Sequence, residues 1–299
     1  MKGCWLAGLV AVLAVFSPSV MAGWYGYLDI GPRYSEARSG DSDVFMDSRG
    51  SFLGFAVEQA LTEQIDLLIQ AEYEIDADAD SDKDFGQNDT FVGLATPLGS
   101  LRAGNLETPL RHLADPVDRF PDTIADPSEL WNGDIQATDS LYYQSPTWGG
   151  FRGEVALIRH DADNRHNGVS SALWFESETG GIALASEKHV TGDHVRRHRV
   201  TLFRSLGAFA LGFTAERESQ PDQPDTLARL FSLAHSSDKR IFKLQYGKSD
   251  LEQFEEYLLS VGIDFLHSNA FGSYLYLHRH EQEEGADFHH AELGLRFSF

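Results

Sequence analysis

The chain ends on Ala291-Glu-Leu-Gly-Leu-Arg-Phe-Ser-Phe299, a stretch that alternates apolar side chains with small or polar ones. Successive side chains of a β-strand point to opposite faces, so Leu293, Leu295 and Phe297 share one face, while Glu292 and Arg296 lie on the other. One face suits hydrocarbon and the other suits water. Such a strand fits the wall of a transmembrane β-barrel, although a soluble β-sandwich shows the same alternation.

The first residues of the chain help to distinguish a transmembrane barrel from a soluble sandwich. Lys2 precedes an apolar run, Cys4–Phe16, and the small residues of Val20-Met21-Ala22 follow it, which is the pattern of a cleavable export signal. We expect residues 1–22 to be the signal peptide and residues 23–299 to form one transmembrane barrel domain. The apolar run is shorter than the roughly 20 residues that a membrane helix needs. Export without a membrane helix favours the barrel.

The rest of the chain divides into short segments with a two-residue period. Sixteen runs of this kind are found. They start near Trp24, Arg49, Ile65, Asn88, Ser100, Thr138, Phe151, Val169, Gly181, Arg197, Ala208, Thr226, Arg240, Glu256, Phe271 and Phe288. Short connections such as Thr96–Gly99 alternate with long ones such as Ser35–Ser48, Asp76–Gln87 and Glu107–Ala137. This rhythm predicts an all-β fold, a transmembrane antiparallel β-barrel of 16 strands, wide enough to hold a water-filled channel.

The charge of the chain limits its partners. The formal net charge is −22, so nucleic acid is not expected as a partner, because phosphate binding needs clustered Lys and Arg. Acidic residues concentrate in a few stretches, of which Asp76–Asp84 is the densest. They are read either as solvated loops or as groups that attract cations to a pore and bridge divalent ions to anionic lipid headgroups such as those of lipopolysaccharide.

Two longer motifs lie within residues 90–151. The first is Thr90-Phe-Val-Gly-Leu-Ala-Thr-Pro-Leu-Gly-Ser-Leu-Arg-Ala-Gly-Asn-Leu-Glu-Thr-Pro109, and the second is Asp139-Ser-Leu-Tyr-Tyr-Gln-Ser-Pro-Thr-Trp-Gly-Gly-Phe151. Both resemble motifs of the Gram-negative general porin family. The resemblance implies a homotrimer in the outer membrane of a Gram-negative bacterium. It also implies passive diffusion of ions and small hydrophilic solutes, and a long third external loop that folds into the lumen and narrows it.

The segment between the motifs is the candidate for that loop. It contains Pro109, Pro116, Pro121 and Pro127, which exclude a regular strand, and a structureless connection of about 30 residues is usually functional or disordered. Its acids outnumber its bases. We expect the pore constriction to be formed by Asp115, Asp118, Asp122, Asp126 and Glu129.

The opposite side of the pore is expected to carry positive charge. By resemblance the family places arginines on the barrel wall, and Arg33, Arg49 and Arg102 are the candidates here. Asn105 and Tyr142 stand where the family has arginine, which removes two positive charges from the predicted wall. A carboxylate-rich constriction facing a weakened basic wall predicts weak to moderate cation selectivity.

Other functions fit the sequence less well. A substrate-specific channel for one nutrient class is the main alternative, with a stacking track made from Tyr142, Tyr143, Tyr274 and Tyr276. A plugged, structural or adhesin-like barrel is a third class. No serine is placed beside a histidine by a recognisable turn, so neither an enzyme nor a cofactor is expected.

Histidines near the chain end raise the question of a metal. His278 and His280 share a face of the penultimate strand, and His289 and His290 begin the last one. Two pairs on adjacent strands are a weak signal for a metal site, and we read them as exposed or headgroup-level side chains. No metal site is predicted.

Overall fold

The computed structural model describes all residues except 1–19, 38, 76–84, 161–165, 252–256 and 282–286. Most of the expected signal peptide and the acidic stretch Asp76–Asp84 therefore lie outside the described residues. No helix among the described residues has the length and apolar character to cross a bilayer.

Seventeen strand segments and two short 3-10 helices make up the described chain. They are β1 (Val20–Ala37), β2 (Ser42–Ser48), β3 (Phe52–Thr62), β4 (Ile65–Ile75), β5 (Phe85–Thr96), β6 (Gly99–Glu107), η1 (Arg111–Leu113), η2 (Pro127–Glu129), β7 (Gln136–Gln144), β8 (Phe151–Ile158), β9 (Gly168–Ser177), β10 (Gly180–Lys188), β11 (Arg196–Leu206), β12 (Phe209–Ser219), β13 (Thr226–Ser237), β14 (Arg240–Ser249), β15 (Tyr257–Leu266), β16 (Phe271–Glu281) and β17 (Asp287–Ser298).

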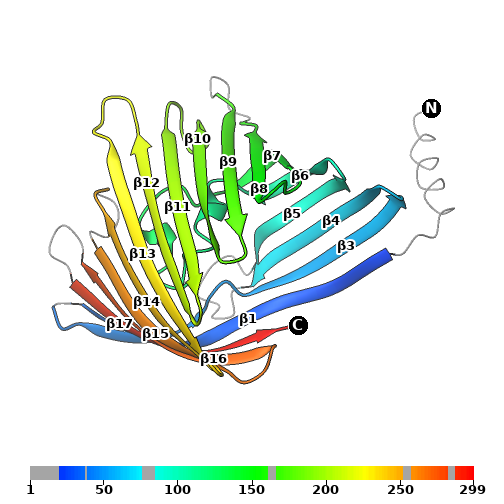
Figure 1. The fold of residues 1–299 in the computed structure, drawn as a ribbon. Coiled ribbons are helices and arrows are strands. Elements are labelled where there is room, and N and C mark those ends of the chain that lie inside the picture. Colours follow the sequence, from blue (N-terminus) through cyan, green and yellow to red (C-terminus); the bar gives the residue numbers. More distant parts are fainter. Residues whose placement is uncertain (1–19, 38, 76–84, 161–165, 252–256, 282–286) are drawn as a thin grey trace, which may run out of the picture.

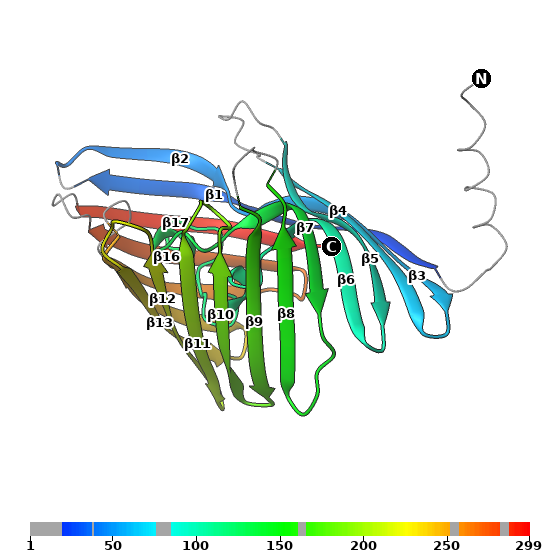
Figure 2. The ribbon, with the colours of Figure 1, turned by 90° about the horizontal axis from the view of Figure 1, so that it is seen from above.

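The strands form one closed antiparallel sheet (Figures 1 and 2). Consecutive strands pair with each other from β3 to β17, and β1 closes the ring by pairing with β17. On its other side, β1 pairs with β2 through residues 30–36 and with β3 through residues 20–27. The segments β2 and β3 thus form one interrupted strand, and the wall has 16 strands.

Fifteen of the 16 predicted strand starts agree with the structure to within four residues, and β4, β8, β13, β14 and β16 start where predicted. The start predicted near Arg49 falls in the interruption between β2 and β3, seven residues after that strand begins at Ser42. The expected long connection Ser35–Ser48 is wrong, because most of it continues β1 and forms β2. The acidic residues around it obscured a short strand, β2, in which the exposed side chains of Val44 and Met46 alternate with Phe45 and Asp47.

The two faces of the strands have different burial. On β17, Leu293, Leu295 and Phe297 are exposed on the outer surface, while Glu292 is fully buried inside the barrel. The same alternation follows β12, where Phe213 is exposed and Glu216 is buried. An apolar outer face against lipid and a polar inner face are the arrangement of an outer-membrane barrel.

This arrangement predicts a large penalty for charge on the outer face. Leu275 lies near the middle of β16 with its side chain outward. We expect Leu275→Arg to lower the free energy of unfolding by about 2–4 kcal/mol, because arginine has to enter hydrocarbon. Urea titration of the protein folded into lipid vesicles measures this. Leu98→Arg, in the exposed turn before β6, is the control with an expected loss of at most about 1 kcal/mol. Equal losses in the two variants would contradict the lipid-facing assignment.

Residues 108–135, between β6 and β7, lie against the inner face of the wall (Figures 1 and 2). Thr201 of β11 donates a hydrogen bond to the carbonyl oxygen of Leu113 at 2.8 Å, and Gln245 of β14 donates to that of Ala125 at 2.7 Å. Both wall residues are buried. We call residues 108–135 the inner loop.

Candidate pore constriction

The inner loop is amphipathic although it contains only two single-turn helices. Its buried side chains face the wall and include Leu110, Leu113, Val117, Phe120, Ala125, Leu130 and Trp131. Its acidic side chains lie on the other side of the loop. Burial of the apolar side chains is the main stabilising contribution, at about 1.5–3 kcal/mol for each large one.

The wall has room for the loop at two glycines. A Cβ on Gly212 of β12 would lie 2.6 Å from Val117, and a Cβ on Gly247 of β14 would lie 2.2 Å from Leu130. Both distances are shorter than side chains tolerate, so a larger residue at either position would displace the loop. At a third contact, the ring of Phe120 meets Tyr276 of β16 edge-on, with 4.9 Å between ring centroids.

The five predicted constriction acids lie together. Asp115, Asp118, Asp122, Asp126 and Glu129 line one cavity of about 380 Å³ on the face of the loop that points away from the wall. The same cavity is lined by Glu107 and Asp134, and by one base, Arg111. A cavity with this excess of carboxylates concentrates cations.

Both additional lining acids, Glu107 and Asp134, are neutralised by ion pairs. Glu107 lies 2.9 Å from Arg111, and Asp134 lies 2.6 Å from Arg199 of β11. No ion pair joins Asp115, Asp118 or Asp122 to any described residue. The uncompensated negative charge of the cavity therefore sits on aspartates that the sequence singled out.

Local backbone geometry fixes some of these aspartates. Asp126 caps η2 by accepting a hydrogen bond from the amide of Ser128 at 2.8 Å, and it also accepts from the amide of Asp122 at 2.9 Å. Asp122 has φ 57°, a left-handed conformation that Asp and Asn adopt more readily than most residues. Its carboxylate lies against Gly50, where a Cβ would come within 2.1 Å. A glycine in the interruption between β2 and β3 thus lets the loop reach the opposite wall.

Desolvation by the surrounding barrel makes these aspartates harder to ionise. It raises the pKa of Asp115 to about 6, although nearby His112 opposes the effect, and it raises the pKa of Asp122 to about 6 with added repulsion from Asp126. The pKa of Asp118 is raised well above its usual value, again chiefly by burial. The charge of the cavity therefore depends on pH near neutrality.

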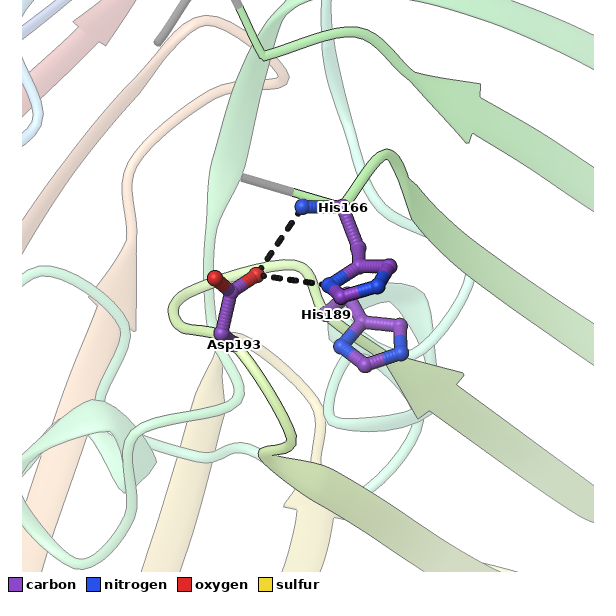
Figure 3. A group of neighbouring side chains, drawn as sticks. All are labelled: His166, His189 and Asp193. Atoms are coloured by element: carbon purple, nitrogen blue, oxygen red, sulfur yellow. Dashed lines mark hydrogen bonds and ion pairs between the residues drawn. The ribbon is translucent and has the colours of Figure 1, made fainter. Parts of the chain in front are cut away.

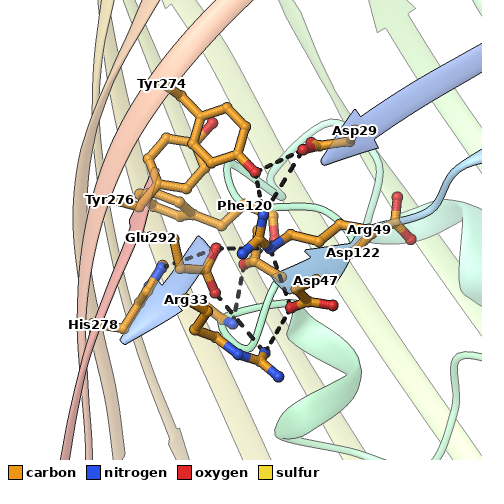
Figure 4. A network of polar contacts seen from close by, with 12 residues as sticks. Asp29, Arg33, Asp47, Arg49, Phe120, Asp122, Tyr274, Tyr276, His278 and Glu292 are labelled. Carbon is orange, nitrogen blue, oxygen red and sulfur yellow. Dashed lines mark hydrogen bonds and ion pairs between the residues drawn. The ribbon is translucent and has the colours of Figure 1, made fainter. Parts of the chain in front are cut away.

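Arg33 and Arg49 lie in an ion-pair network on the wall (Figure 4). Arg49 is buried, with its Nε 3.1 Å from Glu292 and 3.4 Å from Asp47, and it donates a hydrogen bond to the hydroxyl of Tyr274 at 2.5 Å. Arg33 lies 3.1 Å from Asp47. Because acids surround both guanidinium groups, neither supplies net positive charge to the lumen.

Arg102 has a different environment. It donates a hydrogen bond to Gln144 at 2.9 Å, and its guanidinium lies 4.6 Å from the ring centre of Tyr142. Tyr142 and Asn105 do not line the pore as predicted. Tyr142 is buried beneath Arg102 beside His112 of the loop, and Asn105 is buried at a β-bulge, where its amide donates to the carbonyl of Asn88 at 3.0 Å. The prediction for Asn105 came from the family motif, which does not show that the pairing of β6 with β7 shifts register between Gly104 and Leu106.

The tyrosines considered for a stacking track, in the alternative of a substrate-specific channel, do not form an exposed track in the described lumen. Tyr274 and Tyr276 point inward and stack with 4.3 Å between ring centroids, but both are fully buried beneath other side chains. Tyr143 points outward. Three further residues line the cavity without having been predicted, namely Glu107, Arg111 and Asp134. In the sequence, only their position in the proline-rich segment points to this role.

Comparisons with known proteins agree with this architecture. The family profile described as Gram-negative porin matches residues 9–295. The major outer membrane protein P.IB of Neisseria sicca is 33% identical over 167 residues, which cover 49% of this chain and 46% of that protein. This chain spans about half or less of the length of the curated relatives that it matches.

Solved structures extend the likeness to the whole fold. The anion-selective porin of Comamonas acidovorans superposes with a TM-score of 0.76 at 18% identity, over 94% of this chain and 100% of that one. In vitro folded OmpT of Vibrio cholerae, in its trimer form, gives 0.69 at 11% identity, over 94% of this chain and 100% of that one. The predicted 16-stranded barrel is confirmed. Because the family profile covers nearly all of the sequence, this chain is an outer-membrane protein that belongs to the Gram-negative porin family.

Proposed function

We propose that this protein forms a water-filled channel in the outer membrane through which ions and small hydrophilic solutes diffuse, with a preference for cations. The observation that carries the proposal is the cavity of about 380 Å³ beside the inner loop, which is lined by seven acids and one arginine. Membership of the porin family confirms the expectation that the chain is not an enzyme, because porins are channels.

The preference for cations follows from the balance of paired and unpaired charge. The wall guanidinium groups of Arg33 and Arg49 are neutralised by Asp47 and Glu292. Asp115, Asp118 and Asp122 of the loop line the cavity without ion pairs to described residues. The porin of Comamonas acidovorans, with a similar fold, is anion-selective. Fold alone therefore does not set selectivity, and the loop charges of this chain are the basis of the proposal.

Three further features belong to the same proposal. The trimer form of OmpT, which shares the fold, supports a homotrimer. The outward apolar band supports a setting in outer-membrane lipids, including lipopolysaccharide. Cleavage after Ala22 removes the first three residues of β1, Val20–Ala22, which pair with Val57–Gln59 in the full chain, and leaves Gly23 as the first residue of the mature barrel.

Planar bilayer recordings on the purified, folded protein test the channel proposal. We expect a conductance that rises in proportion to salt concentration, and single-channel steps in groups of three. The burial of Tyr274 and Tyr276 disfavours the substrate-specific alternative. Saturating conductance blocked by one sugar or amino acid would support that alternative, and no conductance would support a structural barrel.

The selectivity of the channel is expected to depend on pH. Asp115 and Asp122 have pKa values of about 6, so both are mostly ionised at pH 7.5 and mostly neutral at pH 5. Because protonation removes negative charge from the cavity, we expect the cation preference to weaken as the pH falls through 6. Reversal potentials in a KCl gradient at pH 7.5, 6 and 5 measure this. The Asp115→Asn, Asp122→Asn double variant should show a flatter profile. A preference that is constant over this range would contradict the assignment.

A further inference from the structure

A second cluster of polar side chains lies at the rim of the barrel, far from the acidic loop in the sequence. His166 lies just before β9, and His189, Asp193 and His194 lie between β10 and β11. The hairpin of β9 and β10 brings these two connections side by side, because Lys188 at the end of β10 pairs with Val169 at the start of β9. Figure 3 shows the side chains of His166, His189 and Asp193 converging between the connections.

The potential ligand atoms are already close. One ligand atom from each of His166, His189 and Asp193 lies within 4.8 Å of the other two. The Nδ1 of His166 is 3.3 Å from Oδ1 of Asp193. Two ligands on a tetrahedral zinc ion with bonds of about 2.0–2.1 Å are separated by about 3.3–3.4 Å. The His166–Asp193 pair therefore has the required spacing. The rings of His166 and His189 stack with 4.8 Å between centroids, so binding one ion requires the His189 ring to turn until its nitrogen faces Asp193.

The backbone holds the cluster in this arrangement. The amide of His166 donates to Oδ1 of Asp193 at 3.0 Å, which ties the two connections together. His189 and His194 have φ values of 61° and 69°. The backbone of residues other than glycine rarely adopts this left-handed conformation, which recurs at ligand sites. The amide of His194 donates to Nδ1 of His189 at 2.9 Å, so this nitrogen carries a lone pair that a metal ion could take instead.

We propose that His166, His189 and Asp193 bind one divalent transition-metal ion of the Zn²⁺ class between the β8–β9 and β10–β11 connections. Two imidazole nitrogens and one carboxylate oxygen suit Zn²⁺, Ni²⁺ or Cu²⁺, whereas Mg²⁺ and Ca²⁺ prefer all-oxygen sites. The ring of His194 lies 5.6 Å from the rings of both other histidines and is the nearest candidate for a fourth ligand. The ion would cross-link two connections at the rim.

The histidines considered from the sequence are less suited to a metal. His278 is buried and hydrogen-bonded to Ser260 at 2.8 Å, and the rings of His280 and His290 lie 5.2 Å apart. Of the described residues, His166, His189 and Asp193 are the set of three that is close enough to share an ion. The spacing of these residues in the sequence does not reveal the site, because the β9–β10 hairpin separates its members.

Equilibrium dialysis of the folded protein in detergent against ZnCl2, with excess MgCl2 and CaCl2 present, tests this site. We expect one Zn²⁺ per protomer. The triple variant His166→Ala, His189→Ala, Asp193→Asn should bind Zn²⁺ at least about tenfold more weakly. The matched control is His267→Ala, Asp238→Asn, which changes a histidine and an aspartate in short turns between other strands. This control should bind as the unchanged protein does.

The dialysis results can support or overturn the proposed metal site. Absence of Zn²⁺ binding, a loss of less than tenfold in the triple variant, or equal competition by Mg²⁺ or Ca²⁺ would overturn it. Circular dichroism checks that each variant keeps its strand content. If the triple variant does not fold, His166→Ala alone replaces it, because that side chain is 60% exposed and its removal leaves the wall intact. The outcome is independent of channel conductance, so it does not depend on the proposed function.

Discussion

Replacing Asp115 and Asp122 with asparagine is expected to lower the cation preference of the channel markedly without closing it. Both side chains line the cavity beside the inner loop and form no ion pair with a described residue. A unit charge about 10 Å from a permeating ion contributes about 0.4 kcal/mol in water, which changes the local cation concentration about twofold and the cation-to-anion ratio about fourfold. Salt screening reduces this effect, so low ionic strength gives the largest change.

Asparagine is a suitable replacement because it keeps the shape of aspartate and tolerates the φ of 57° at Asp122. The matched control is Asp222→Asn, Asp238→Asn, which removes the same number of charges from two other connections where both residues also have positive φ, 60° and 51°. Reversal potentials in a KCl gradient at pH 7.5 compare the variants. An equal shift in both double variants would show that overall charge, and not the loop, sets the selectivity.

Replacing Phe120 with alanine is expected to release the inner loop and widen the channel. The Phe120 ring is fully buried, with its centroid 4.9 Å from that of Tyr276 and 5.5 Å from that of His278. Removing a buried phenylalanine costs about 3–5 kcal/mol, and here the cost falls on the contact between loop and wall. The 16-strand ladder does not depend on this contact. We therefore expect a folded barrel with higher and noisier single-channel conductance.

Phe213→Ala is the control for this prediction, since the Phe213 ring lies on the lipid face of β12. It should leave the conductance unchanged. If Phe120→Ala also leaves the conductance unchanged while the protein remains folded, the inner loop does not limit the flow. That result would remove the loop acids from the permeation path.

The sequence predicted the barrel well because a strand in a membrane wall has a strict two-residue period. The alternation of Leu293, Leu295 and Phe297 with Glu292 and Arg296 is preserved in the structure, with apolar side chains outward. The period fails where the backbone departs from regular pairing. The pairing of β6 with β7 shifts register around Asn105, which is buried, and the interruption at Gly50 divides one strand into β2 and β3.

The candidate site could be predicted only in part. Composition marked the acids of the proline-rich segment, and the structure brings Asp115, Asp118 and Asp122 to one cavity. The pairing of charges was not predictable, because it depends on side chains from distant strands. Arg49, for example, is neutralised by Glu292, at the other end of the chain. Counting arginines on early strands therefore overestimated the positive charge that faces the lumen.

The central claim is that Asp115, Asp118 and Asp122 of the inner loop set the charge of an open, water-filled pore. The reversal potential of the unmodified protein in a planar bilayer, at pH 7.5 under a KCl gradient, tests it most directly. We predict measurable conductance and a reversal potential of the sign that corresponds to K⁺ permeating faster than Cl⁻. A reversal potential of the opposite sign, or a folded barrel that passes no current, would contradict the account.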